Sequence, residues 1–375
     1  MRILLAVKDF DFGGAQNHVR QLANALVARG QRVWVAAPPG RQAALLHSSV
    51  EHVPVSYSDL NHPLQALRLA RLVRREGIDV IHAHQRLATM TACLAGRLTA
   101  RPVVATLHGQ LQHDLTRWPG APAMLARLIV VSPFFADLVA RHSPVLGPKT
   151  VCIPNGARRA PAVAGRADGR QVVVCAARVI HRMEAFLTDL ADAAGELARE
   201  HPAFELHIYG DGPALPALVS RTEEANRAAG RTVVRLRGYH PDLPVALARA
   251  SLVLGVGRVA LEALMQGVPV IPVNRRYLGQ PVSRRRYSAL ATTNFVPQHS
   301  PPPDRAALRR ALADAVGHLD GLAREARDLQ PLVARDYDLD VVAGRVEELY
   351  RSLAPSPCHA DDRVQESMAT DRLVA

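Results

Sequence analysis

Short apolar runs alternate with amphipathic segments along most of the chain. In the first half, runs typical of buried strands cover residues 3–7, 32–36, 53–56, 80–84, 103–108, 128–132 and 150–153. A second series covers residues 172–176, 205–209, 233–237, 252–254 and 268–273. Strands that alternate with helical patterns are typical of parallel sheets with helices on both faces. We therefore predict an α/β protein with two doubly wound, Rossmann-like domains that face a central cleft.

A change of composition marks the boundary between the two domains. Residues 160–169 are rich in proline, glycine and alanine, as linkers often are. We assign residues 1–160 to the first domain and residues 161–338 to the second. Residues 354–375 mix proline, serine, aspartate and arginine without periodicity, which is typical of a disordered tail.

A carboxylate at Glu262 stands out, because it falls in a short helix between two apolar strands. Residues 252–254 and 268–273 form the strands, Gly257 is the turn, and residues 258–265 form the helix. Ligands of such sheets bind beyond the carboxyl ends of the strands, and we place Glu262 there, at the start of the helix. It is therefore a candidate ligand-binding residue. The alternative is a carboxylate that only complements the helix dipole.

A glycine turn near the amino end has a similar position. Gly13 and Gly14 follow the first strand, and residues 17–29 have the pattern of an amphipathic helix. Glycines at such a turn let backbone N–H groups approach a phosphate at the helix N-terminus. Any tight turn between a strand and a helix could use the same pair, and the spacing differs from that of a dinucleotide-binding motif.

Composition and charge limit the location and the partners. The chain of 375 residues is 48% hydrophobic, but it has no uninterrupted apolar run of about 18 residues, and its first residues lead straight into a strand. We therefore expect a cytoplasmic protein without a membrane span or signal peptide. The net charge is +12, and all basic residues except Lys8 and Lys149 are arginines. Aromatic residues make up only 4% of the chain, so we do not expect nucleic acid binding.

Positive charge gathers on one predicted helix, residues 63–76. We expect its arginines to lie opposite its leucines, with Arg68, Arg71, Arg74 and Arg75 on one side and Leu64, Leu67, Leu69 and Leu72 on the other. Such a helix can rest on an anionic membrane surface, which would place the protein at the inner face of the membrane. It can also be an ordinary solvated helix.

Seven short motifs together resemble the retaining GT-B glycosyltransferases of family 4. They are Gly13–Gln16, Asp79–His84, Thr106–Gly109, Val130–Ser132, Ile153–Gly156, Tyr209–Pro213 and Ala260–Ala263, in order along residues 1–353. The resemblance implies transfer of a sugar from a nucleotide-sugar donor, here taken as a UDP-sugar, to a cell-envelope, polysaccharide or lipid-linked acceptor. It implies no metal. In the family the second domain holds the nucleotide, the first binds the acceptor, and the final helix, here residues 339–353, crosses back to the first domain.

The resemblance also assigns roles to individual residues. Glu262 would hydrogen-bond the ribose, and His108 would lie near the donor sugar. Arg178 matches the family's phosphate-binding arginine, whose planar guanidinium suits a diphosphate. The remaining positions expected at the nucleotide sugar, several of them through backbone N–H groups, are Gly14, Gly210, Gly257, Arg258, Val259 and Leu261.

Two positions depart from the family pattern. Met183 occupies the position of the family's lysine, and Leu254 that of the first carboxylate of its paired-glutamate motif. Arg182 is the candidate to replace the charge of the lysine. Two alternatives to an active transferase follow, namely a catalytically silent subunit that binds nucleotide sugars beside a partner enzyme, and a nucleotide-sugar epimerase.

Two further features have competing interpretations. His82 and His84 alternate on one strand and could form a metal pair, but no third ligand is near in sequence, so we expect them to line the cleft or the core. Residues 110–122 are interpreted as a loop over the acceptor side of the cleft or as a simple connection.

Overall fold

The computed structural model describes residues 1–11, 13–109, 120–161 and 169–353. The chain divides into two compact units. Unit 1 comprises residues 1–130, 138–153 and the chain from Ala343 onward, and unit 2 comprises residues 131–137 and 154–342. The expected acceptor-side loop, most of the expected linker and the tail after residue 353 lie largely or wholly outside the described residues.

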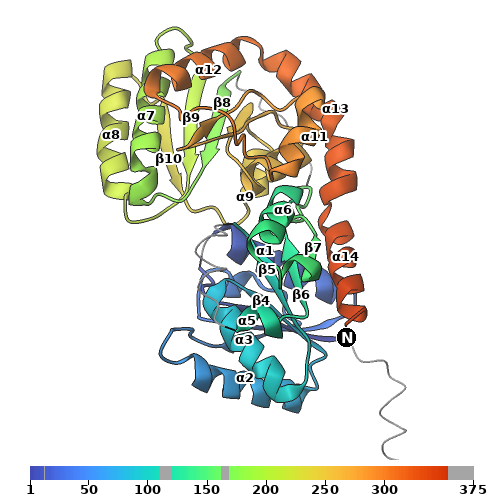
Figure 1. The fold of residues 1–375 in the computed structure, drawn as a ribbon. Helices are drawn as coiled ribbons and strands as arrows, with labels where there is room; N and C mark the ends of the chain where they lie inside the picture. The colour runs from blue at the N-terminus through green and yellow to red at the C-terminus, as the bar shows by residue number, and fades with distance from the viewer. Residues whose placement is uncertain (12, 110–119, 162–168, 354–375) are drawn as a thin grey trace, which may run out of the picture. The chain divides into compact units, whose positions relative to one another are not determined.

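Unit 1 is built on a parallel sheet with the strand order β3-β2-β1-β4-β5-β6-β7 (Figure 1). The strands are β1 (Arg2–Val7), β2 (Arg32–Ala37), β3 (Val50–Pro54), β4 (Val80–His84), β5 (Val103–Leu107), β6 (Arg127–Val130) and β7 (Thr150–Cys152). The helices are α1 (Gly14–Ala28), α2 (His62–Glu76), α3 (Arg86–Thr99), α5 (Ala121–Met124) and α6 (Pro133–His142), of which residues 133–137 are assigned to unit 2. All residues of β4 and β5 are buried, as expected for central strands covered on both faces.

Unit 2 has a second parallel sheet, with the order β10-β9-β8-β11-β12, and a small hairpin of β13 and β14. Its strands are β8 (Gln171–Ala176), β9 (Phe204–Tyr209), β10 (Val234–Gly238), β11 (Leu252–Leu254), β12 (Val270–Ile271), β13 (Val273–Asn274) and β14 (Tyr277–Leu278). Its helices are α7 (His181–Leu197), α8 (Leu215–Ala229), α9 (Leu243–Leu247), α10 (Arg258–Met265), α11 (Arg284–Thr292), α12 (Arg305–Gly317) and α13 (Leu319–Tyr337).

Side chains that alternate along the central strand β8 build two separate cores. Val173 and Cys175 pack with residues of α7, α8 and α12 on one face of the sheet. Val172 and Val174 pack with residues of α10 and α13 on the other face. Because both faces of the strand are buried, β8 is apolar from Val172 onward. The two Rossmann-like units confirm the predicted fold class.

The last helix, α14 (Leu339–Arg351), begins in unit 2 and ends in unit 1. At its start, the Leu339 N–H donates to the carbonyl of Ala157 (3.0 Å). Near its end, the buried carboxylate of Glu347 accepts from Nε of Arg29 (2.8 Å) and Nε2 of Gln31 (2.8 Å). A partly buried ion pair and a hydrogen bond from the Gln31 amide hold this end of the helix against the end of α1 and the residues that follow it.

Apart from shifts of a few residues at the ends of elements, two predicted strands and the predicted position of Glu262 differ from the structure. β3 covers Val50–Pro54 rather than residues 53–56, because pairing with β2 extends this polar, half-exposed edge strand. The predicted strand 268–273 is divided into β12 and β13 at Pro272, which has no N–H for a ladder. Glu262 is the fifth residue of α10, so the expectation that it opens the helix is wrong, and no acidic residue lies in the first turn.

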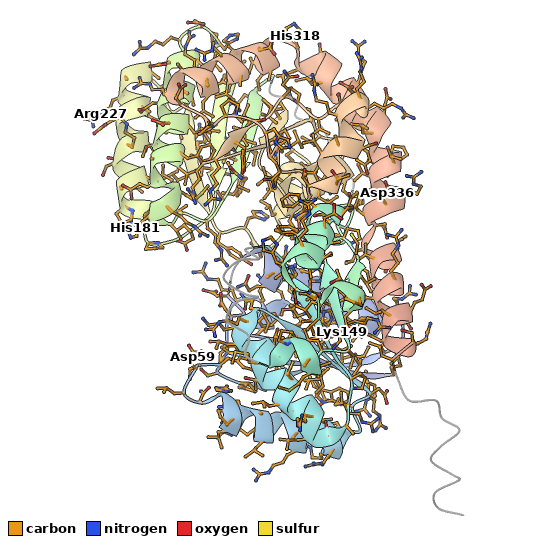
Figure 2. All side chains as sticks on the ribbon, in the orientation of Figure 1. Asp59, Lys149, His181, Arg227, His318 and Asp336 are labelled. Carbon is orange, nitrogen blue, oxygen red and sulfur yellow. The ribbon has the colours of Figure 1, made fainter. Side chains whose placement is uncertain are left out.

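The leucines of α2 correct another expectation. Leu69 and Leu72 are buried, but Leu64 and Leu67 are 52% and 48% exposed, on the same side as the arginines. Leu60, just before the helix, is 96% exposed. We use the name α2 surface for the exposed residues Leu60, Leu64, Leu67, Arg68, Arg71, Arg74 and Arg75. Asp59, which Figure 2 labels, lies next to this surface in sequence and forms an ion pair with Arg86 (3.2 Å). In the described part of the chain, no helix is long and apolar enough to cross a membrane.

Candidate functional site

The order of the strands in unit 2 places a ligand site at the middle of its sheet. After β8, the chain adds β9 and β10 on one side and then β11 and β12 on the other. Ligands of open parallel sheets bind beyond the carboxyl ends of the strands at such a switch point. Here the switch point lies between the loop after β8, residues 177–180, and the loop after β11, residues 255–257.

A pocket of about 240 Å³ opens between these two loops. It is lined by Cys175, Ala176, Ala177, Arg178, Ile180, Arg182, Met183, Phe186, Leu254, Gly255, Val256, Val273 and Asn274. Arg178 and Arg182 are both exposed, whereas most other lining residues are apolar. Two exposed guanidinium groups beside one pocket suit a ligand with a diphosphate, because charge-assisted hydrogen bonds to phosphate are strong and often bidentate.

The two departures from the family pattern lie in the same pocket. Leu254 ends β11 and is only 2% exposed, and Met183 packs against the core on the α7 face of the sheet. Neither side chain can neutralise a phosphate, and neither offers a strong acceptor for a hydroxyl group. The pocket therefore has an apolar wall, and its charge comes from Arg178 and Arg182.

Gly210 and Gly212 allow the loop that carries Arg178 to lie against the end of β9. The Ala177 N–H donates to Tyr209 (3.0 Å) and the Val179 N–H to Asp211 (3.1 Å). A Cβ added to Gly210 would lie 1.8 Å from the carbonyl oxygen of Ala177, and φ is +144° there. This close approach requires glycine and positions Arg178. Direct contact of Gly210 with a nucleotide remains a prediction.

The first turn of α10 starts two residues beyond the pocket. Gly257 precedes it with φ +59°, and the Leu261 N–H already donates to the Gly257 carbonyl (3.0 Å). Because the first N–H groups of a helix have no intrahelical acceptor, those of Arg258 and Val259 can point toward an anion. Leu261 differs from the expectation, since its N–H is engaged and its side chain is buried in the core.

The Glu262 carboxylate is occupied by a neighbour on its own helix. It forms a short ion pair with Nη2 of Arg258, whose Nη1 also donates to the carbonyl of Gly156 (3.3 Å). The side chains are 3% and 9% exposed, respectively. A carboxylate offers about four acceptor positions, so the pair leaves Glu262 chemically able to accept from a ribose as well.

In unit 1 the switch point lies between β1 and β4. Gly13 precedes α1 with φ +147°, its carbonyl accepts from the Asn17 N–H (3.0 Å), and Gly14 is the exposed first residue of the helix. The predicted glycine turn is thus a helix N-terminus beyond a strand, which suits an anion.

Histidines from three elements of unit 1 meet near the same switch point. His18 is on α1, His84 ends β4, and His108 follows β5. Nδ1 of His84 lies 3.0 Å from Nε2 of His108, and the rings of His18 and His108 have centroids 5.0 Å apart. Burial, together with His82, His108 and His18, lowers the pKa of His84 well below its usual value. The three histidines are far apart in sequence, so no short motif contains them all, and the fold brings them together.

His82 is a fully buried core residue, as one of the two interpretations expected. Its Nδ1 lies 2.5 Å from the hydroxyl of Tyr350 on α14, and its Nε2 lies 2.7 Å from Oγ1 of Thr106. Burial, and to a smaller extent His108, lowers its pKa to about 3. Both ring nitrogens of His82 have partners, so its role is to tie α14 to the sheet.

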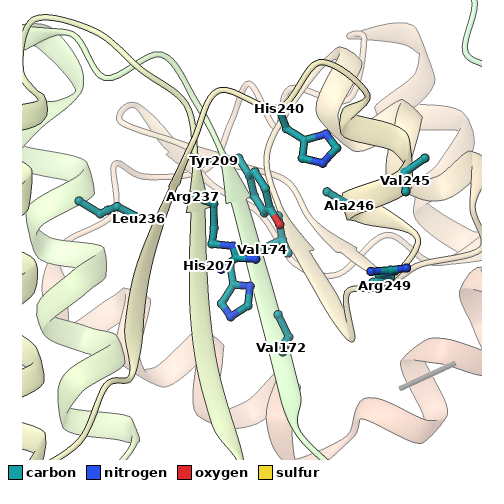
Figure 3. A pocket seen from close by; sticks show the side chains of 10 residues that line it. All are labelled: Val172, Val174, His207, Tyr209, Leu236, Arg237, His240, Val245, Ala246 and Arg249. Atoms are coloured by element: carbon teal, nitrogen blue, oxygen red, sulfur yellow. The ribbon is translucent and has the colours of Figure 1, made fainter. Parts of the chain in front are cut away.

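A second pocket, of about 370 Å³, lies over β8, β9 and β10 and was not predicted from the sequence (Figure 3). His207 and Tyr209 alternate on one face of β9, and Figure 3 shows them beside Arg237 of β10 and opposite Val245 of α9. The alternation of polar residues on β9 was the available signal. Because α9 is short, this part of the sheet is left open.

Two family models match the chain. Residues 12–159 match Glycosyltransferase Family 4, and residues 170–292 match Glycosyl transferases group 1. Together the two matches cover most of the chain and reach both of its parallel sheets.

Two named proteins are similar to the chain over nearly their whole length. The phosphatidyl-myo-inositol mannosyltransferase of Mycobacterium tuberculosis is 29% identical, over 95% of this chain and 98% of that protein. The glycogen synthase of the same organism is 26% identical, over 93% of this chain and 94% of that protein. The crystal structure of Anabaena HepE in complex with UDP has a TM-score of 0.71 at 17% identity, over 94% of this chain and 100% of that chain, which shows the fold. With both family models matched and this fold shared, the chain belongs to the GT-B glycosyltransferases of family 4.

Proposed function

We propose that this glycosyltransferase moves a sugar from a UDP-sugar to a lipid-linked or polysaccharide acceptor of the cell envelope, with retention at the anomeric carbon. The observation that carries the proposal is the pocket at the switch point of unit 2. Arg178 and Arg182 lie beside it, and the N-terminus of α10 follows one of its loops. This combination of cations and helix N–H groups suits a nucleoside diphosphate leaving group.

Names of similar proteins support the choice of donor and acceptor. The mannosyltransferase relative is named for phosphatidyl-myo-inositol, which is a lipid. HepE was crystallised with UDP and with UDP-glucose. The two family models that match are glycosyltransferase models, and neither supports the alternative of a nucleotide-sugar epimerase.

In the proposed reaction, the bond between the anomeric carbon and the diphosphate breaks as the acceptor oxygen attacks from the same face of the sugar. The acceptor proton passes to an oxygen of the leaving diphosphate. Arg178 and Arg182 stabilise the charge that develops on this leaving group, Glu262 binds the ribose, and His108 orients the donor sugar. Such catalysis consists of positioning and charge stabilisation, without a protein nucleophile.

The α2 surface is the proposed contact with an anionic membrane. It combines exposed leucines at 60, 64 and 67 with four exposed arginines, which is the composition of helices that lie in a membrane interface. Sedimentation with phosphatidylglycerol vesicles tests it. The Leu64→Ser/Leu67→Ser variant should bind less than wild type, and equal binding would contradict the contact.

A second candidate is a silent nucleotide-sugar-binding subunit. It is favoured by the presence of Met183 and Leu254 together in the pocket, where the family has a lysine and a carboxylate. Such a chain would bind the donor without transferring the sugar.

The deciding experiment incubates the protein with UDP-, GDP- and ADP-sugars and envelope lipids, and identifies the product and its anomeric configuration by NMR. An α-linked donor should give an α-linked product. His108→Ala should lower turnover far more than it weakens binding of the bare nucleotide. Nucleotide binding without transfer would favour the silent subunit, and an inverted product would contradict retention.

A further inference from the structure

The histidine cluster of unit 1, made of His18, His84 and His108, brings together three ring nitrogens. One nitrogen of each ring lies within 4.8 Å of one nitrogen of each of the other two rings. His18 and His84 are buried and His108 is half-buried, so the nitrogens meet in a largely dry place. They come from a helix and the ends of two neighbouring strands, which are rigid supports.

The spacing is close to that of a tetrahedral zinc site. Zinc binds imidazole nitrogen at about 2.0–2.1 Å, so two ligands of one ion lie about 3.3–3.4 Å apart. The His84–His108 pair, at 3.0 Å, is near this value already. The widest gap closes by rotations that move the ring nitrogens by about an ångström, because imidazole rings turn readily about their terminal torsion.

The buried ring of His84 supplies an independent observation. Its Nδ1 faces His108, but its Nε2 has no hydrogen-bond partner among the described residues. A buried polar atom without a partner is unfavourable, so such an atom calls for an explanation. Coordination through Nε2 takes the lone pair of this atom, whereas coordination through Nδ1, the nitrogen that faces His108, places the proton of the ring on Nε2.

We propose that His18, His84 and His108 bind one divalent transition-metal ion, with zinc as the best fit. Imidazole suits zinc, copper and nickel, whereas calcium and magnesium prefer oxygen ligands. Three histidines leave a fourth position open, as in mononuclear zinc sites with three protein ligands. This inference concerns unit 1 alone, and metal binding itself does not depend on the proposed function.

One consequence does rest on the proposed function. The ion uses a lone pair of His108, the residue proposed to orient the donor sugar, and it adds positive charge where that sugar lies. Occupancy of the site should therefore inhibit transfer reversibly. If zinc binds the wild type but does not inhibit transfer, the proposed role of His108 is refuted and the metal site is not.

The test uses the full-length protein without a histidine tag, treated with a chelator and titrated with Co²⁺ and then Zn²⁺. Cobalt in a site of this kind absorbs visible light, which reports the geometry, and calorimetry gives the stoichiometry of zinc. We expect one ion per chain, released by EDTA. His18→Asn and His108→Asn should each weaken zinc binding by at least about a hundredfold, because even second-shell changes cost 10- to 100-fold.

His142→Asn is the matched control, since His142 is an exposed histidine of α6, outside the cluster. It should bind zinc as the wild type does. Absence of stoichiometric binding by the wild type would overturn the proposal, as would binding retained by either cluster variant or lost in the control. Circular dichroism of each variant separates loss of the site from loss of the fold, and His108, the half-buried member, is the one whose replacement disturbs the core least.

Discussion

The Glu262 carboxylate and the Arg258 guanidinium form an ion pair one turn apart on α10, and both side chains are nearly buried. The two residues expected to hold the nucleotide therefore also hold each other. Removal of Glu262 leaves the Arg258 charge without its partner, so the change acts on stability as well as on binding.

We expect Glu262→Leu to lower the free energy of unfolding by about 3 kcal/mol, the usual cost of breaking a buried pair. The double variant Arg258→Met/Glu262→Leu should recover at least half of this loss, because neither charge remains. Urea unfolding followed by circular dichroism measures both values. A double variant that is less stable than Glu262→Leu would show that the pair is not the cause.

Gly210 should tolerate no side chain, because a Cβ would meet the Ala177 carbonyl oxygen at 1.8 Å. Gly230 is the matched control, since its φ is also positive, at +68°, but an added Cβ would meet nothing within 4 Å. Gly210→Ala should cost about 1–3 kcal/mol more than Gly230→Ala, the usual cost of overpacking. It should also weaken nucleotide binding through Arg178. Equal melting temperatures and equal affinities for the two variants would refute this account of the loop.

The buried histidines predict a loss of stability in acid. The pKa of His82 is about 3 in the folded chain and about 6.5 when unfolded, and that of His84 is also lowered. Between the two values for His82 the unfolded chain binds more protons, so the free energy of unfolding falls as pH drops from 6.5 toward 3, by about 1.4 kcal/mol per pH unit for this histidine. The lowered pKa of His84 acts in the same direction.

Metal-free protein should be unfolded with urea at pH 7, 6 and 5 to measure this slope. His82→Asn should lower the slope between pH 6 and 5 by the contribution of about one proton. If the variant has the wild-type slope, His82 does not carry the effect.

Arg182 should replace the family's lysine if the chain is an active transferase. Arg182→Ala should then lower the transfer rate by about two or more orders of magnitude, the scale of removing one preorganised donor from a developing charge. Met183→Lys should change little, because the charge is already supplied. Arg227→Ala is the charge-matched control, because Arg227 lies in the last turn of α8 and does not line the pocket. This variant should keep the wild-type rate. Strong activity that survives Arg182→Ala would leave Arg178 and the N-terminus of α10 to stabilise the leaving group.

The elements that could be predicted best from the sequence are those marked by their own run of apolar residues. Residues 252–254 are all apolar, and residues 80–84 combine Val80, Ile81 and Ala83 with two histidines; they form β11 and β4 with the predicted boundaries. β3 was misplaced because its residues are polar, and pairing with β2, rather than burial, sets where it starts. Periodicity reports burial, so it misses edge strands.

The candidate site also has parts that the local sequence marks and parts that depend on the fold. The loops around Arg178 and Gly257 could be predicted, since glycines and family motifs mark them. The pairing of Glu262 with Arg258 was also accessible, because residues four apart on a helix face each other. The meeting of His18 with His84 and His108 was not accessible, since it depends on the order of the strands in the sheet.

The central claim is that the pocket beside Arg178 and the N-terminus of α10 bind a nucleoside diphosphate. Titration calorimetry of UDP, GDP and ADP into wild type, Arg178→Ala, Glu262→Gln and Arg227→Ala tests it most directly. We expect UDP to bind wild type with one site per chain. Arg178→Ala and Glu262→Gln should each weaken binding by about tenfold or more, which is the scale of a charged hydrogen bond. Arg227→Ala should bind UDP as wild type does. Failure of all three nucleotides to bind wild type, or equal affinities for all four proteins, would contradict it.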